Sequence, residues 1–281
     1  MSTAAGTFAG GGRSKVVRTT VIALVVLYVG ALILAPLAGI VWATLKSGFS
    51  VVTETLEKPD VRHAYWLTLV ITLTTVLVTA VFGVTTAWVL ARHSFPGRGL
   101  LNALVDLPMA VSPVIVGLMA ILLFGAGGWF EPFLAARGIS VIFALPSMII
   151  VTIFICISFV IREVYPVLEE IGVAEEEAAR TLGASSLQTF FRVTLPSIRW
   201  GLLYGIALST ARALGEIGAV LIVSGTLQGQ TETAPLYIFR ALEERQDTSG
   251  YVVALSLAAI SILLLVAIES FKKKQREEMG K

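Results

Sequence analysis

The sequence predicts an all-α integral membrane protein with six transmembrane helices. Hydrophobic residues make up 56% of the 281 residues and charged residues only 14%, whereas soluble domains carry roughly 25% charged residues. Mean hydropathy is +0.85, and six apolar runs each approach the ~20 residues that a helix needs to cross a bilayer. No soluble domain fits between these runs. The formal net charge of +2 is too small to indicate binding to nucleic acid.

The expected spans divide the chain into three parts. Residues 1–18 are expected to form a flexible cytoplasmic tail, residues 19–271 the transmembrane domain, and residues 272–281 a basic cytoplasmic tail. The first apolar run follows basic residues, as in a signal peptide, but it exceeds the length of a signal h-region and is therefore expected to be a span. The six spans are expected at 19–45, 65–91, 100–124, 142–161, 198–224 and 251–271.

Basic residues indicate the orientation of the chain. Most of the 21 Lys and Arg residues fall in segments that would face the same side as the N-terminus, and cytoplasmic loops carry an excess of Lys and Arg. Both termini and the segment 177–196 are therefore expected in the cytoplasm. Tryptophans near the expected span ends fit an interfacial belt; they are Trp42, Trp66, Trp88 and Trp200.

The polar segment between the fourth and fifth spans begins with a pattern typical of a short helix that ends at a glycine. Ala174, Ala178 and Leu182 repeat at i, i+4 and i+8, which places them on one helical face. Gly183 follows, where a residue of positive φ is easiest to place.

A second short helix is expected directly after this glycine. Ser185 and Gln188 have the spacing of a capping box, and Pro196 is expected to end the helix. Its apolar stripe consists of Leu187, Phe190 and Phe191. Two helices joined at a glycine are typical of a docking element, but an amphipathic loop on the bilayer surface fits the spacing equally well.

The third expected span carries polar residues and two prolines. Prolines five residues apart should unwind or kink the helix, freeing backbone groups that must face protein or a water-filled cavity. The segment is either a packing kink with Asp106 near the inner interface or part of a translocation pathway. The pathway candidates here are Asp106, Pro108, Ser112 and Pro113.

The fifth expected span contains the pathway candidates Ser209, Arg212 and Glu216. Arg212 lies about 18 Å of helical rise beyond Trp200, near the bilayer midplane, where an arginine requires a partner. Glu216 is one turn away and can share its face. The pair either holds helices together or lines a pathway through the membrane. Small residues on this span permit close helix contact: Gly201, Gly205, Gly215 and Gly218.

Several chemistries are excluded or left open by the rest of the chain. No P-loop is present, so the chain is not expected to hydrolyse ATP, and a single cysteine, Cys156, excludes an internal disulfide or a multi-cysteine metal site. No metal site is expected. The loop 225–250 either receives a substrate-delivery protein or is simply solvated.

The polar segment resembles the E-A-A-x3-G-x9-I-x-L-P signature of ABC importer permeases. The matching residues are Glu177, Ala178, Ala179, Gly183, Val193, Leu195 and Pro196, with valine in the isoleucine position. The resemblance implies that this segment is the cytoplasmic coupling helix, which inserts into a groove on a separate ATP-hydrolysing subunit.

Further segments are similar to the W-type permease subunits of the bacterial sulfate/thiosulfate ABC importer. These segments are 106–113, 128–129, 200–205, 211–216 and 223–225. The resemblance implies a type I ABC importer permease fold in the bacterial inner membrane. It also implies a homologous T-type permease, two ATPase subunits that bind ATP and Mg, a sulfate-binding protein at the outer face, and no cofactor in this chain.

Three alternatives are weighed against this interpretation. Importers of molybdate and tungstate share the coupling motif and a similar Arg-Ala-x-Gly-Glu run, but the Asp-Leu-Pro…Ser-Pro pattern favours sulfate. A channel has no use for a docking loop with a glycine hinge. A membrane-embedded enzyme needs a converging catalytic set, and the spans provide only Asp106, Arg212 and Glu216.

Overall fold

The computed structural model describes residues 11–279, and within that range the chain forms helices and no strand. The expected all-α class is confirmed. The helices are α1 (Gly11–Lys46), α2 (Phe49–Glu57), α3 (Pro59–Arg92), α4 (Arg98–Ala110), α5 (Pro113–Phe124), α6 (Glu131–Ala135), α7 (Leu145–Ile171), α8 (Ala174–Thr181), α9 (Ser186–Thr189), the π-helix η1 (Phe190–Thr194), α10 (Leu195–Leu214), α11 (Gly218–Ser224), α12 (Ala234–Glu243) and α13 (Asp247–Met279).

Two of the six expected spans are not single helices. α4 and α5 are bent by 113°, and the helix that ends with α10 is bent by 53° from α11. The spans expected at 100–124 and 198–224 are therefore corrected to bent pairs. Within the described residues 11–279, four helices, α1, α3, α7 and α13, are long and apolar enough to cross a membrane alone, and the bent pairs raise this number to at most six.

The bend between α4 and α5 has a local cause. Ser112 is extended, with φ −60° and ψ 136°, and Pro113 begins α5, where its missing N–H leaves no intrahelical bond unmade. The break expected from the prolines is confirmed, although Pro108 lies inside α4 and does not interrupt it.

The centre of the molecule is formed by α3, α7 and α10. Buried apolar side chains join these helices, among them Leu90, Val160, Val164 and Ile198. α10 approaches α7 closely at Gly205. A Cβ added there would lie only 2.9 Å from the Cα of Val160, so only glycine leaves enough room for this contact. Small residues allow the van der Waals contact that holds helices together in a membrane, so the expected role of Gly205 is confirmed.

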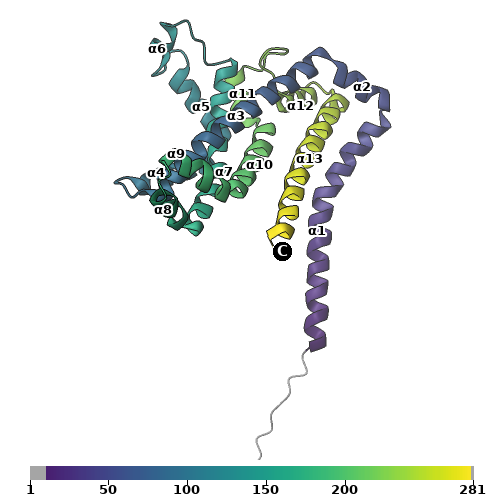
Figure 1. Ribbon diagram of the computed structural model, residues 1–281. Coiled ribbons are helices and arrows are strands. Elements are labelled where there is room, and N and C mark those ends of the chain that lie inside the picture. Colours follow the sequence, from purple (N-terminus) through teal and green to yellow (C-terminus); the bar gives the residue numbers. More distant parts are fainter. Residues whose placement is uncertain (1–10, 280–281) are drawn as a thin grey trace, which may run out of the picture.

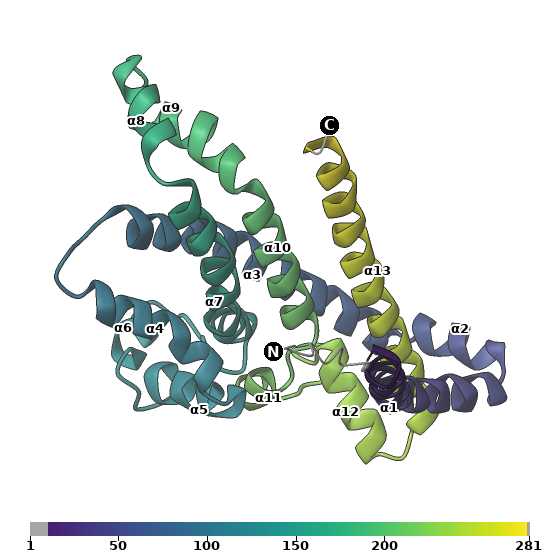
Figure 2. The same cartoon turned by 90° about the horizontal axis from the view of Figure 1, so that it is seen from below.

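α1 lies apart from this centre. Its apolar side chains are exposed, and it contacts α13, the last helix of the described chain (Figure 1). Figure 2 shows α1 end-on beside α13 and away from α5, α7 and α11. Helix α1 begins within the expected tail at 1–18, and α13 continues into the one expected at 272–281. Residues 1–10 and 280–281 lie outside the described part of the chain.

The connections lie on two opposite sides of the molecule. Figure 1 shows α8, α9, the N-terminal end of α1 and the C-terminal end of α13 toward one side, and α2, α6 and α12 toward the other. The 177–196 segment and both ends of the described chain therefore share a side.

Candidate coupling and translocation site

The segment that carries the E-A-A signature forms two short helices joined at a glycine, as expected. Gly183 has φ +88°, a conformation that L side chains rarely adopt. Ser185 caps α9: the N–H of Gln188 donates to Ser185 Oγ at 3.3 Å, and the N–H of Ser185 donates to Gln188 Oε1 at 2.9 Å. The predicted positive φ and the capping box are both confirmed.

The expectation that Pro196 ends the second helix is wrong. α9, η1 and α10 follow one another without a gap, and Ser186–Leu214 behaves as one helical element. Pro196 lies in the first turn of α10, directly after the wider π-turns of η1. A change of hydrogen-bond register at this point accommodates a residue without an N–H.

The signature residues divide into an exposed set and an inward set. Glu177, Ala178, Gly183 and Pro196 are exposed, whereas Ala179, Val193 and Leu195 are half-buried, and Leu195 packs against the core. Beside the exposed set, three large apolar side chains point into solvent; this tip patch consists of Leu182, Leu187 and Phe191, with exposed fractions of 89%, 72% and 56%. Exposed apolar clusters of this kind mark interaction sites.

Glu176 anchors this element, although its place in an acidic run gave no reason to single it out. Its carboxylate lies between Arg92 at the end of α3 and Thr194 in η1. Arg92 Nη2 donates to Glu176 Oε1 at 3.1 Å, and Thr194 Oγ1 donates to the same oxygen at 2.9 Å. Glu175 and Glu177 on either side are exposed. Helical phase could have separated the three glutamates only if the inward face of α8 had been known.

The candidates of the third span lie along α4 and at its break from α5. Asp106 is paired with Arg162 of α7, at 2.6 Å between Oδ2 and Nη2. Pro108 is buried, Ser112 is exposed, and Pro113 is half-buried. Asp106 is therefore held against α7, and its carboxylate is accessible, with 55% of the side chain exposed.

Arg212 and Glu216 form the ion pair expected from their spacing. Arg212 Nη1 lies 2.7 Å from Glu216 Oε2; the Arg212 side chain is 31% exposed and that of Glu216 only 2%. α10 ends at Leu214, so the pair bridges the break to α11, and Glu216 Oε1 accepts the N–H of Ala219 at 2.8 Å. Glu216 thus satisfies a free amide at the start of α11 while it holds a partly exposed guanidinium.

Ser209 belongs to a row of buried hydroxyls that the sequence reasoning missed. Its Oγ lies 3.2 Å from Thr79 Oγ1 of α3. Thr79 continues a set of buried threonines on one face of α3, spaced by three and four residues; the others are Thr68, Thr72 and Thr75. That spacing is visible in the sequence and is the signal that could have identified the row.

The Arg240 cluster joins the loop 225–250 to the start of α3; it consists of Asp60, Glu232, Arg240 and Glu244. Arg240 Nε donates to Glu232 Oε1 at 2.6 Å, and the Glu232 side chain is 1% exposed. Hydrogen bonding to Glu232 raises the pKa of Arg240 above its ordinary value. The interpretation of this loop as simply solvated is therefore wrong for Glu232, because Glu232 is buried against Arg240 of α12, which itself pairs with Asp60 of α3 at 3.5 Å.

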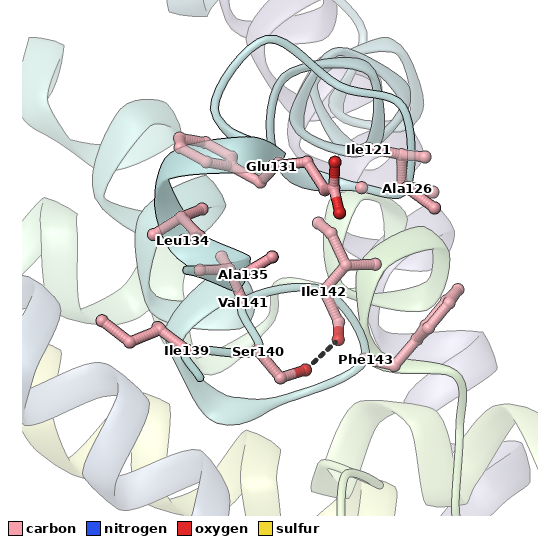
Figure 3. A pocket seen from close by; sticks show the side chains of 12 residues that line it. Ile121, Ala126, Glu131, Leu134, Ala135, Ile139, Ser140, Val141, Ile142 and Phe143 are labelled. Atoms are coloured by element: carbon pink, nitrogen blue, oxygen red, sulfur yellow. Dashed lines mark hydrogen bonds between the residues drawn. The ribbon is translucent and has the colours of Figure 1, made fainter. Parts of the chain in front are cut away.

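A hollow of about 490 Å³ lies between the end of α5, α6 and residues 139–143 (Figure 3). In Figure 1, α5 and α6 lie toward the side opposite α8. Its lining is apolar apart from Glu131 and Ser140, whose Oγ donates to the Ile142 carbonyl. The lining contains no basic side chain, and a carboxylate repels anions. The hollow therefore does not fit an oxyanion, in contrast to the partly exposed guanidinium of Arg212.

Comparison with known proteins identifies the family. Residues 80–277 match the family described as binding-protein-dependent transport system inner membrane component. The chain is 46% identical over 245 residues to the sulfate transport system permease protein CysW of Synechococcus elongatus, covering 87% of this chain and 86% of that protein. It is 42% identical over 250 residues to CysW of Escherichia coli K12, covering 89% and 86%. The sulfate transport system permease protein CysT of Salmonella typhimurium is 38% identical over 248 residues, covering 88% and 90%.

Solved structures show that the chain has the fold of type I ABC importer permeases. A bacterial ABC transporter that imports the acidic polysaccharide alginate superposes with a TM-score of 0.77 at 18% identity, covering 93% of this chain and 96% of that one. The MetNI methionine ABC transporter gives 0.54 at 18% identity, covering 75% and 94%. The chain is a multi-pass inner-membrane protein, and it belongs to the family of binding-protein-dependent transport system inner membrane components, with CysW-type permeases among its relatives.

Proposed function

We propose that this chain forms, with a homologous permease, the translocation pathway of an ATP-driven sulfate and thiosulfate importer. The observation that carries the coupling to ATP is the tip patch beside the exposed Glu177 and Ala178, on a helix fixed to the rest of the protein through Glu176. The relatives named as sulfate permeases support the substrate. The chain itself is a non-catalytic subunit, and ATP and Mg bind to its ATPase partner.

The proposed partners follow the two sides of the molecule. Two ATPase subunits dock on the side that carries α8 and α9, which is the cytoplasmic side, so both termini are cytoplasmic. A sulfate-binding protein approaches from the side of α6 and α12. The homologous permease is of the T type, and CysT proteins are similar to this chain along most of its length.

Arg212 is the proposed anion contact within the membrane. Its guanidinium is partly exposed while its partner Glu216 is buried, and guanidinium donors match the geometry of oxyanions. Glu216 holds the arginine and keeps the passing anion from being trapped. Asp106, Pro108, Ser112 and Pro113 lie along the other broken span, and Ser209 joins the hydroxyl row of α3 about one helical turn before Arg212.

Uptake of radiolabelled sulfate tests the substrate. The complex is expressed in a host that lacks its own importer, and thiosulfate or molybdate is added as competitor. We expect thiosulfate to compete and molybdate to compete weakly. Uptake of labelled molybdate in preference to sulfate would establish the molybdate alternative instead.

The Gly183→Val substitution tests the coupling loop. A side chain at φ +88° is strained by roughly 1–2 kcal/mol, which should displace α8 from α9 while leaving membrane insertion normal. We expect ATPase binding or ATP-dependent uptake to fall. Full uptake with the ATPase still bound would show that this glycine is not a docking hinge.

A further inference from the structure

Glu176 joins the proposed docking helix α8 to two other segments. Arg92 Nε donates to both carboxylate oxygens at 3.2 Å, Arg92 Nη2 donates to Oε1 at 3.1 Å, and Thr194 Oγ1 donates to Oε1 at 2.9 Å. We call Arg92, Glu176 and Thr194 the inner clamp. It connects α8 to the end of α3 and to η1, which continues into α10.

Arg92 extends the inner clamp to a fourth segment. Its Nη1 donates to the carbonyl of Leu168 in α7 at 2.8 Å. The Arg92 and Glu176 side chains are only 6% and 7% exposed, so water has little access to the hydrogen bonds between them. The ends of α3, α7, α8 and η1 therefore meet at one buried ion pair.

The backbone on both sides of α8 is built from glycines in the left-handed region. Gly172 has φ +65° and Gly183 has φ +88°, and a Cβ at either position would meet nothing within 4 Å. Packing at these two Cβ positions therefore does not restrain α8, although the Ala184 N–H donates to the Ala179 carbonyl across the second joint at 3.0 Å. Since α8 has only eight residues and one buried side chain, Glu176, the inner clamp is the buried side-chain contact that holds it.

We propose that Glu176 and Arg92 are positioning residues that transmit movement of the ATPase-bound α8 to α3, α7 and α10 as one rigid unit. This inference rests on the proposed function, in which the ATPase docks on α8. With the inner clamp intact, displacement of α8 moves the helix that leads to Arg212. Without it, α8 turns on its two glycines and the displacement is lost.

The variants separate this role from a structural one. Glu176→Gln leaves a buried, unpaired Arg92, so reduced folding is expected from that change alone. The double variant Arg92→Met/Glu176→Gln removes both charges and should restore the amount of folded complex. Glu169→Gln is the matched control, because Glu169 pairs with Arg98 at 3.6 Å on the same side but is 51% exposed.

The decisive readout is the amount of sulfate transported per ATP hydrolysed, measured on purified complex in liposomes. We expect the double variant to bind and hydrolyse ATP with its partner but to transport about tenfold less sulfate per ATP. The Glu169→Gln complex should match the wild type. A double variant with the wild-type ratio would overturn the proposal.

Hydrogen exchange of α8 in the purified permease tests the inner clamp without sulfate or ATP. We expect the amides of Ala174–Thr181 to exchange at least about tenfold faster in the double variant than in the wild type and in Glu169→Gln. Unchanged exchange would overturn the proposal. If the wild-type complex itself shows no sulfate-dependent ATP hydrolysis, the proposed function fails, whereas the exchange result still decides whether the inner clamp fixes α8.

Discussion

The two broken spans differ in what breaks them. α4 and α5 are bent by 113° at an extended serine followed by a proline, whereas α10 and α11 are bent by 53° across Gly215, Glu216 and Ile217. Pro113 favours the first break, because it lacks the N–H that would continue α4 and disfavours a helical conformation at the preceding Ser112, which is extended. Glycine only permits the second, which is held by Glu216 as a cap of α11 and as the partner of Arg212. The second break is therefore the one that can respond to its surroundings.

The helices that follow the two breaks, α5 and α11, pack together, whereas the helices that precede them, α4 and α10, have different partners. α5 and α11 pack closely at Gly117, where an added Cβ would lie only 2.7 Å from the Cβ of Ile222. Their preceding helices differ: α4 is tied to α7 through Asp106 and Arg162, whereas α10 continues from α9 and η1. Ser186–Leu214 is one helical element, about 44 Å long. A displacement of α9 would thus reach the second break along one helix, whereas α8 lies outside this element.

Substitution of Arg212 should have the largest effect at the second break. Arg212→Met leaves the buried Glu216 carboxylate unpaired, which should destabilise the folded permease by about 3–5 kcal/mol, and the yield of purified complex should fall. The double variant Arg212→Met/Glu216→Gln keeps an oxygen for the Ala219 amide and should restore the yield. If Arg212 contacts the anion, uptake per complex stays below about a tenth in the double variant. Normal uptake by the double variant would show that the pair serves only to hold helices together.

Adding a methyl group between α5 and α11, the second helices of the two broken spans, should have a smaller effect. At Gly117, an added Cβ meets the Ile222 side chain at 2.7 Å and the Ala219 carbonyl at 2.9 Å. Gly117→Ala should therefore cost about 1–3 kcal/mol through overpacking and lower the thermal unfolding midpoint of the purified complex. An unchanged midpoint would mean that α5 and α11 do not pack as tightly as described.

The smallest effect is expected at Gly215. Its φ is −99°, and an added Cβ would meet only the Ala211 carbonyl, at 3.8 Å. Gly215→Ala should change stability by no more than about 0.5 kcal/mol, which makes it the matched control for Gly117→Ala. A loss of stability equal to that of Gly117→Ala would indicate that the second break needs a glycine after all.

The sequence could predict features with a local cause, such as the first break, better than features that depend on contacts between distant segments, such as the second break. The break at Pro113, the positive φ of Gly183 and the capping box at Ser185 depend on local chemistry, and all three were predicted. The Arg212–Glu216 pair was predicted from its spacing, but not the end of α10 between the two residues. That end depends on Glu216 capping Ala219 and on contact between α5 and α11.

Two further features depend on contacts between distant segments. Glu176 could not be distinguished from its acidic neighbours, because its partner Arg92 lies 84 positions away in the chain. Pro196 was expected to end a helix, and only the register change in η1 shows why it does not. Sequence patterns thus identified the signature and the candidate pathway residues, but not the bonds that hold them in place.

We propose that the ATPase docks on the tip patch. Leu182 and Trp129 provide a matched pair for testing it, because their side chains are 89% and 85% exposed and they lie beside α8 and α6, on opposite sides of the molecule. Each is replaced in turn by a photoreactive amino acid in the assembled complex, which is then irradiated in membranes. We predict that position 182 cross-links to the ATPase subunit and that position 129 does not. Cross-linking of the ATPase from position 129, or from neither position in a complex that still transports sulfate, would show that the ATPase does not dock on the tip patch.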